Sequence, residues 1–197
     1  MNEKIHWSEN IIIADADYLD NVTFNLIVNF ERMIGRRIPN ADIAHWLDCI
    51  ALDGGIREGE NEIQVLFIHD KKKKAFENLQ PSDFEKELNG KAFKDHLGEF
   101  IMTSLKVEDI VSKVQFVNDV VGAACAQKEI KRIMIIPDAD DGETYDQLRG
   151  ALQHVDDDSK RITMFAMQPM AGGNFRQEIL GYSLLSALGI HPDEIKE

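Results

Sequence analysis

The chain has 197 residues, of which 44% are hydrophobic and 29% charged, an ordinary globular composition for a single domain spanning 1–197. Its net charge of −13 argues against indiscriminate nucleic-acid binding, because such binding depends on basic residues that neutralise phosphates. No apolar run reaches the roughly 18 residues of a membrane span, and the start of the chain lacks an apolar signal core. We therefore expect a cytoplasmic protein that makes no membrane contact.

Five runs rich in β-branched and aliphatic residues predict strands. The first, second and fourth are almost continuously apolar, which is typical of strands covered on both faces of a parallel sheet. The five runs are 10–16, 62–69, 99–107, 132–139 and 161–168.

Helical patterns alternate with these strands. The first one stops at Gly35, and the second has Asn40 as its expected N-cap and ends at Gly54 and Gly55. The predicted helical segments are 21–35, 39–55, 107–130, 142–155 and 174–188.

Residues 71–98 interrupt this alternation. The segment begins with four lysines and contains Pro81 and Gly90, so we expect a lysine-rich insertion that is irregular or partly helical. The rest of the pattern predicts a Rossmannoid α/β fold: a three-layer sandwich with a mainly parallel, five-stranded sheet. Right-handed crossovers would bring the carboxyl ends of its strands to one edge, where ligands bind in such folds.

Acidic residues follow three of the predicted strands. Several carboxylates brought together at one edge repel each other unless a cation lies among them, and their hard oxygen atoms suit Mg²⁺ or Mn²⁺. Such a site could activate water for the cleavage of a phosphodiester. The acids are Asp15 and Asp17 after the first strand, Asp70 after the second, and Asp138, Asp140 and Asp141 after the fourth.

The same acids have a structural explanation, because an Asp at the end of a strand often caps the following helix. If Asp15, Asp70 and Asp138 point apart and each accepts a hydrogen bond from a backbone N–H group, this explanation is favoured.

Four lysines come directly after Asp70 and would rim the same edge. In an acidic chain, Lys71, Lys72, Lys73 and Lys74 are candidates for phosphate contacts, although a solvated surface loop is the commoner explanation of such a run. His69, just before them, is expected to be a buried core histidine rather than a general base.

The arrangement resembles the PIN-like superfamily, and most nearly its NYN branch of metal-dependent ribonucleases. The similarity rests on "IIIADAD" (11–17) and "RIMIIPDADDGETYDQL" (132–148), where Asp15, Asp138 and Asp140 match the family's acidic residues. "VNDVVGAACA" (117–126) is similar to the family's preceding helix, so that Asp119 matches an aspartate able to face the metal.

This resemblance implies a Mg²⁺- or Mn²⁺-dependent nuclease that cleaves RNA. Asp15, Asp138 and Asp140 would bind the metal and orient water, supported by Asp17, Asp70, Asp119 and Asp141, and Lys71–Lys74 would contact phosphates. The sequence leaves open assembly into a homo-oligomer.

Two other classes of function remain. The first is a phosphatase resembling the HAD class, with Asp15 as covalent nucleophile, although Leu19 stands where that class has threonine. The second is a catalytically inactive scaffold or interaction domain whose acids are helix caps.

Overall fold

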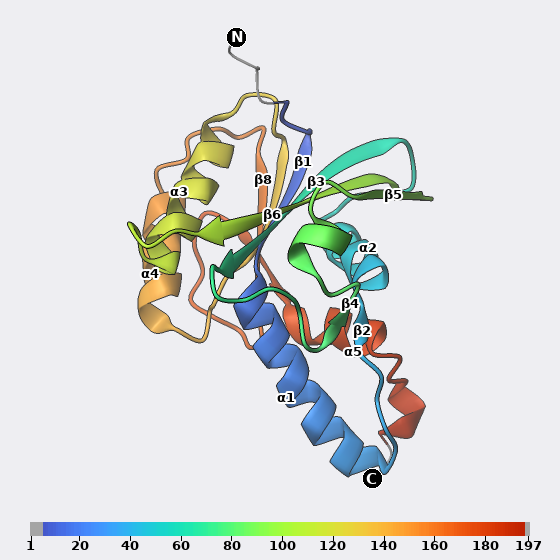
Figure 1. The fold of residues 1–197 in the computed structure, drawn as a ribbon. Helices are drawn as coiled ribbons and strands as arrows, with labels where there is room; N and C mark the ends of the chain where they lie inside the picture. The colour runs from blue at the N-terminus through green and yellow to red at the C-terminus, as the bar shows by residue number, and fades with distance from the viewer. Residues whose placement is uncertain (1–5, 196–197) are drawn as a thin grey trace.

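The computed structural model describes residues 6–195 as a seven-stranded sheet with helices on both faces (Figure 1). The strands of this sheet are β1 (Asn10–Asp15), β3 (Asn61–Asp70), β5 (Ala92–Asp95), β6 (Gly98–Val107), β7 (Arg132–Ile136), β8 (Arg161–Ala166) and β9 (Arg176–Ile179). The helices are α1 (Ala16–Ile34), α2 (Ile43–Asp53), α3 (Lys113–Ala126), α4 (Gly142–Leu152) and α5 (Leu180–Ala187). A short turn of 3₁₀ helix, η2 (Pro192–Glu194), follows α5.

The strand order is β5-β6-β3-β1-β7-β8-β9, and every neighbouring pair except β5–β6 is parallel. The first three parallel strands of the chain lie on one side of the sheet and the later ones on the other, which is the order of a doubly wound sheet. The order reverses between β1 and β7. In open sheets of this type, ligands bind outside the carboxyl ends of the strands at this switch point.

Two apolar cores hold the three layers together. Ile12 and Ala14 of β1 face a core shared with α1, α2 and α5, whereas Ile11 and Ile13 face a core shared with α3 and α4. Because successive side chains of a strand point to opposite faces, a continuously apolar strand serves both cores. The prediction of a three-layer α/β fold with a mainly parallel sheet is therefore confirmed.

The predicted count of five strands is wrong, because β5 and β9 extend the sheet at its two edges. Residues 176–179 lie within a predicted helix (174–188), yet they pair with residues 163–166 of β8, and the helix begins only at Leu180. Pairing with the edge of a preformed sheet overrides the helix propensity of this segment.

The segment 71–98 is more regular than we expected. It contains β4 (Leu79–Gln80), which pairs with β2 (Ala41–Asp42), then a π-helical turn, η1 (Phe84–Leu88), and then β5. Phe76, Phe84 and Leu88 are buried in the core beneath it. The segment is therefore anchored in the domain core, although Lys71–Lys74 at its start are exposed.

Three helix starts also differ from the prediction. Asp42, not Asn40, caps α2, and its carboxylate accepts hydrogen bonds from the N–H groups of Ala44 and His45. The predicted helix at 107–130 begins later than expected: residue 107 is the last residue of β6, and α3 starts at Lys113 with Ser112 as its N-cap. The first helix begins at Ala16, directly after β1, instead of at residue 21.

No helix within residues 6–195 is both long enough and apolar enough to cross a membrane.

Candidate functional site at the carboxyl edge of the sheet

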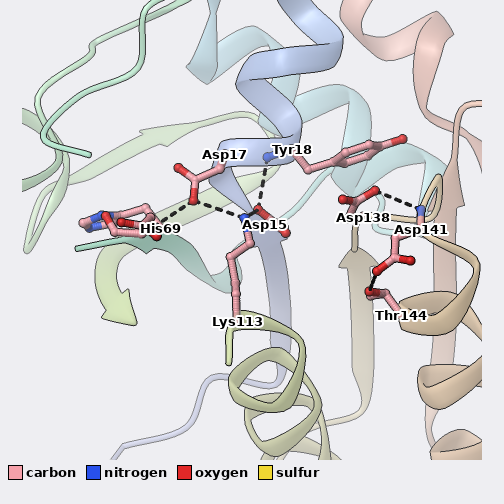
Figure 2. A network of polar contacts seen from close by, with 9 residues as sticks. Asp15, Asp17, Tyr18, His69, Lys113, Asp138, Asp141 and Thr144 are labelled. Carbon is pink, nitrogen blue, oxygen red and sulfur yellow. Dashed lines mark hydrogen bonds and ion pairs between the residues drawn. The ribbon is translucent and has the colours of Figure 1, made fainter. Parts of the chain in front are cut away.

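Asp15 ends β1 and caps α1, so its side chain lies at the switch point of the sheet. The residue is only 3% exposed. Its Oδ1 atom accepts a hydrogen bond from the N–H group of Tyr18 (3.1 Å) and lies 3.2 Å from Nζ of Lys113 (Figure 2). The other oxygen, Oδ2, accepts no hydrogen bond from any residue in 6–195. Burial raises the pKa of Asp15, although Lys113 and the Tyr18 N–H group act to lower it.

Lys113, the first residue of α3, joins Asp15 to Asp17. Its Nζ atom lies 3.2 Å from Oδ2 of Asp17, and the same oxygen accepts a 2.8 Å hydrogen bond from the N–H group of Asp70. Burial acts to lower the pKa of Lys113, but the two aspartates raise it above its ordinary value. The ammonium group therefore stays charged and partly neutralises the acids at the end of β1.

Tyr18 connects the ends of β1 and β7. Its hydroxyl group donates a 2.8 Å hydrogen bond to Oδ2 of Asp140. Figure 2 shows the ring of Tyr18 reaching from α1 to a position above Asp138. Burial and the hydrogen bond to Asp140 raise the pKa of Tyr18 well above its ordinary value. The charges of Asp138 and Asp15 raise this pKa further. One of the predicted acids, Asp140, therefore contacts the phenol directly, and the charges of two others act on it from further away.

Asp138 and Asp141 shape the turn between β7 and α4. Oδ1 of Asp138 accepts a hydrogen bond from the N–H group of Asp141 (3.2 Å). Oδ2 of Asp141, the N-cap residue of α4, accepts one from the hydroxyl group of Thr144 (2.6 Å; Figure 2). Oδ2 of Asp138 and Oδ1 of Asp140 have no hydrogen-bond partner within the described part of the chain.

The side chains of two predicted supporting acids do not join this group. Asp70 is exposed, and its Oδ1 atom accepts a hydrogen bond from the N–H group of Lys72 (2.9 Å). Asp119 is also exposed and lies on α3 between Val117 and Val121, which face the core. Asp119 therefore points away from the sheet, and the structure does not bring it to the other acids.

Helix and turn capping accounts for part of the acidic pattern. Asp15, Asp70 and Asp138 each accept a hydrogen bond from a backbone N–H group, as the structural explanation of these acids expects. Capping does not explain why Asp15 is buried beside Lys113, or why Asp140 accepts from Tyr18. A buried, charged network in a position where ligands bind is a recognised feature of functional sites.

The tightest group of acidic and histidine ligand atoms in residues 6–195 is elsewhere. Ligand atoms of Asp48, Asp95 and His96 all lie within 4.8 Å of one another, whereas Asp15, Asp138 and Asp140 form no group this tight. Asp48 comes from α2, Asp95 is the last residue of β5, and His96 lies in the turn before β6. Burial and the hydrogen bond and charge of Asp95 raise the pKa of Asp48 to about 7.

The predicted lysines line a cavity of about 370 Å³ next to the acidic edge. Lys71, Lys73 and Lys74 line it, but Lys72 does not. Lys71 forms an ion pair with Asp109. His69 is buried, as predicted, and its ring stacks on Phe84 with centroids 4.1 Å apart.

Sequence reasoning missed Lys113, Tyr18 and the lysines outside the run at 71–74. The position of Tyr18, three residues after an N-cap aspartate, was a usable signal, because it places the side chain on the first turn of α1 beside the strand end. The sequence held no comparable signal for Lys113, which reaches the site because of the crossover from β6 to β7.

A divalent cation fits the donor chemistry of the acidic edge. Asp15, Asp138 and Asp140 each keep one free carboxylate oxygen, and Mg²⁺ usually binds through only one or two carboxylates, with water and substrate phosphate as further ligands. Because the ligand atoms of the three carboxylates are not all within 4.8 Å of one another, a cation here would be bound by one or two of them together with water.

Residues 4–195 match the family of unknown function DUF6621, and the chain belongs to this family. Neither the curated proteins nor the solved structures contain a match to this chain.

Proposed function

We propose that this member of the DUF6621 family is a Mg²⁺- or Mn²⁺-dependent phosphodiesterase of PIN/NYN type that cleaves RNA between the carboxyl ends of β1 and β7. One observation carries the proposal: Asp15 at the end of β1, and Asp138 and Asp140 after β7, each keep one carboxylate oxygen free of hydrogen bonds from the described residues. Tyr18 joins the two strand ends through its hydrogen bond to Asp140. The location supports it, because this is the switch point of a doubly wound sheet.

Each residue of the site has a distinct part in this proposal. Asp138 and Asp140 would hold the cation at the mouth of the site, and the free oxygen of Asp15 would complete the set. When bound, the cation supplies an activated water and stabilises the attacking and leaving oxygens. Tyr18 orients Asp140 through its hydrogen bond, and Lys113 limits the repulsion between Asp15 and an incoming phosphate.

The HAD-like alternative receives less support from the geometry. A covalent nucleophile must approach the phosphorus atom directly, but Asp15 is 3% exposed and its Oδ1 atom is already engaged by Lys113 and Tyr18. Leu19, which stands where that class has threonine, is fully buried and offers no hydroxyl group.

A non-catalytic scaffold is the second candidate function. The observation that favours it is the backbone N–H bond accepted by each of Asp15, Asp70 and Asp138. In this case no cation binds at the edge, and substitution of Asp140, which caps no helix, has no functional effect.

Thermal unfolding at increasing Mn²⁺ concentration separates the two candidates. We expect Mn²⁺ to raise Tm in the wild type, because a ligand at 100 times its Kd stabilises the folded state by about 2.7 kcal/mol. Asp140→Asn should abolish this rise. Asp158→Asn, the same change at an exposed acid between α4 and β8, is the matched control and should keep it. No rise in the wild type, or equal rises in both variants, would overturn the proposed metal site.

Activity then identifies the substrate class. With Mn²⁺ present, we expect cleavage of single-stranded RNA by the wild type and Asp158→Asn but not by Asp140→Asn. Hydrolysis of a generic phosphomonoester with no RNA cleavage would instead favour the phosphatase.

A further inference from the structure

A second charged region lies beside the acidic edge, at the ends of β3 and β6. Five lysines line its cavity of about 370 Å³: Lys71, Lys73 and Lys74 after β3, Lys86 on η1, and Lys106 on β6. This concentration is unexpected in a chain with 35 acidic and 22 basic residues. We refer to it as the lysine pocket.

Four of these lysines have no acidic partner. Among residues 6–195, no carboxylate forms an ion pair with Lys73, Lys74, Lys86 or Lys106, whereas Lys71 is paired with Asp109. Like charges gathered around one hollow repel each other, so the folded state gains nothing from this grouping unless an anion enters. All four lysines are exposed, so the grouping costs the folded state little, but a hollow lined by unpaired ammonium groups is suited to an anion.

The two acids that line the pocket, Asp83 and Glu85, offset only part of this charge, because five lysines line it. The carboxylate of Asp83 accepts hydrogen bonds from the N–H groups of Glu85 (3.0 Å) and Lys86 (2.8 Å), so it serves as the cap of η1. Glu85 is exposed on the first turn of η1.

The walls of the pocket are preorganised. The Ser104 hydroxyl group donates to the carbonyl oxygen of Phe84 (2.9 Å), and the Asn89 side chain accepts from the N–H group of Ser104 (3.0 Å). These bonds hold η1 against β6. Below them, the stacked rings of Phe84 and His69 form a buried aromatic floor. A hollow with an apolar floor and a few convergent charged groups has the character of a small-ligand site.

We propose that the lysine pocket binds the phosphate groups of a nucleotide, either free or at the end of an RNA strand. The cavity volume lies in the usual range for small-ligand sites, and ammonium groups are effective phosphate contacts as point charges. Asp17, which accepts from the N–H group of Asp70, links the acidic edge to the loop that carries Lys71, Lys73 and Lys74. Binding of the terminal phosphate of an RNA rests on the proposed function, but binding of phosphate itself does not.

The test measures binding by calorimetry in the presence of EDTA, so that it does not depend on the metal site. The probes are ATP, inorganic pyrophosphate, adenosine, and one RNA oligonucleotide with either a 5′-phosphate or a 5′-hydroxyl group. We expect ATP or pyrophosphate to bind and adenosine not to bind. A preference of at least tenfold for the 5′-phosphorylated RNA identifies a strand end as the ligand, and binding of ATP or pyrophosphate without binding of either RNA identifies a free nucleotide. Equal binding of the two RNAs would show contact with internal phosphates and would overturn the inference.

Two double variants carry the same change in charge. Lys86→Gln/Lys106→Gln removes two unpaired lysines of the pocket and should weaken phosphate binding at least tenfold. Lys94→Gln/Lys128→Gln removes two exposed lysines outside it and should leave binding within about twofold of the wild type. Both should keep the wild-type Tm, because exposed lysines contribute little to stability. Absence of binding to every phosphate probe, or equal weakening in the two double variants, would overturn the inference without bearing on Mn²⁺ binding at Asp140.

Discussion

The acidic edge and the lysine pocket lie side by side on the same edge of the sheet, but they differ in how their charges are paired. At the acidic edge, Asp15 and Asp17 share Lys113, and Asp140 accepts from Tyr18. In the lysine pocket, four ammonium groups have no carboxylate partner within the described residues. At the acidic edge the chain itself supplies a cation, Lys113, to two of the acids, whereas the described residues supply no acid to the four unpaired lysines of the pocket.

This difference separates folding from binding. A buried charge that loses its internal partner destabilises the protein, so residues of the acidic edge should report first on stability. An exposed charge without a partner costs little to remove, so residues of the lysine pocket should report almost only on ligand binding.

The largest effect is expected when Lys113 is replaced. Lys113→Met leaves Asp15 buried without a cation, and we expect a loss of about 2 kcal/mol in the free energy of unfolding, below the usual range for a buried pair because the lysine side chain is 33% exposed. Without Lys113 the pKa of Asp15 rises further. The free energy of unfolding then falls as the pH rises from the ordinary pKa of an aspartate, 3.8, to the raised pKa of Asp15 in the folded protein. The loss caused by the substitution is therefore largest at pH 8 and smallest near pH 4.

Denaturant unfolding at several pH values measures this loss. Lys71→Met removes the lysine of the exposed pair with Asp109 and is the matched control, with no measurable change expected. Equal losses in the two variants would show that the acidic edge is no more dependent on its internal cation than the surface is.

A smaller effect is expected at Asp48, where two acids meet without a lysine. Because burial and Asp95 raise the pKa of Asp48 to about 7, the wild type loses stability as the pH rises from about 4 to 7 and little more above that. Asp48→Asn removes this titration and should stabilise the protein by roughly 1–2 kcal/mol at pH 8, but much less at pH 4. A gain that is the same at both pH values would contradict the assigned cause.

The smallest effect is expected at Tyr18. Tyr18→Phe removes the hydrogen bond to Asp140 and should cost about 1 kcal/mol, measured by denaturant unfolding. The second oxygen of Asp140 then becomes available, so Mn²⁺ should still raise Tm in this variant. Tyr182→Phe, at a tyrosine that is 74% exposed, is the control for stability. Loss of the Mn²⁺ response in Tyr18→Phe alone would mean that the phenol itself takes part in the metal site.

The sequence predicted the inner part of the sheet because its signals there are local. The isoleucine runs of β1 and β7 show that both faces are buried, and Gly35 ends α1 in the left-handed conformation that its residue type allows (φ 72°). The outer strands β5 and β9 were missed because their pairing depends on a neighbouring strand, and residues 176–179 carry the propensity of a helix.

The candidate site was predicted only in part for the same reason. A strand end followed by aspartates is visible in the sequence, so Asp15, Asp138 and Asp140 could be selected. The partners of these acids come from elsewhere in the chain: Lys113 is 98 residues from Asp15, and Tyr18 is 122 residues from Asp140. Whether Lys113 reaches Asp15 depends on the crossover from β6 to β7 and on the residue at which α3 begins.

The two outermost strands also affect how molecules of this protein behave towards each other. β5 and β9 have four residues each, and they carry Lys94 and Asp95 on one border and Arg176 and Glu178 on the other. Short edge strands with charged side chains are poor templates for the addition of a strand from a second molecule. We therefore expect the purified protein to resist edge-to-edge aggregation even at high concentration.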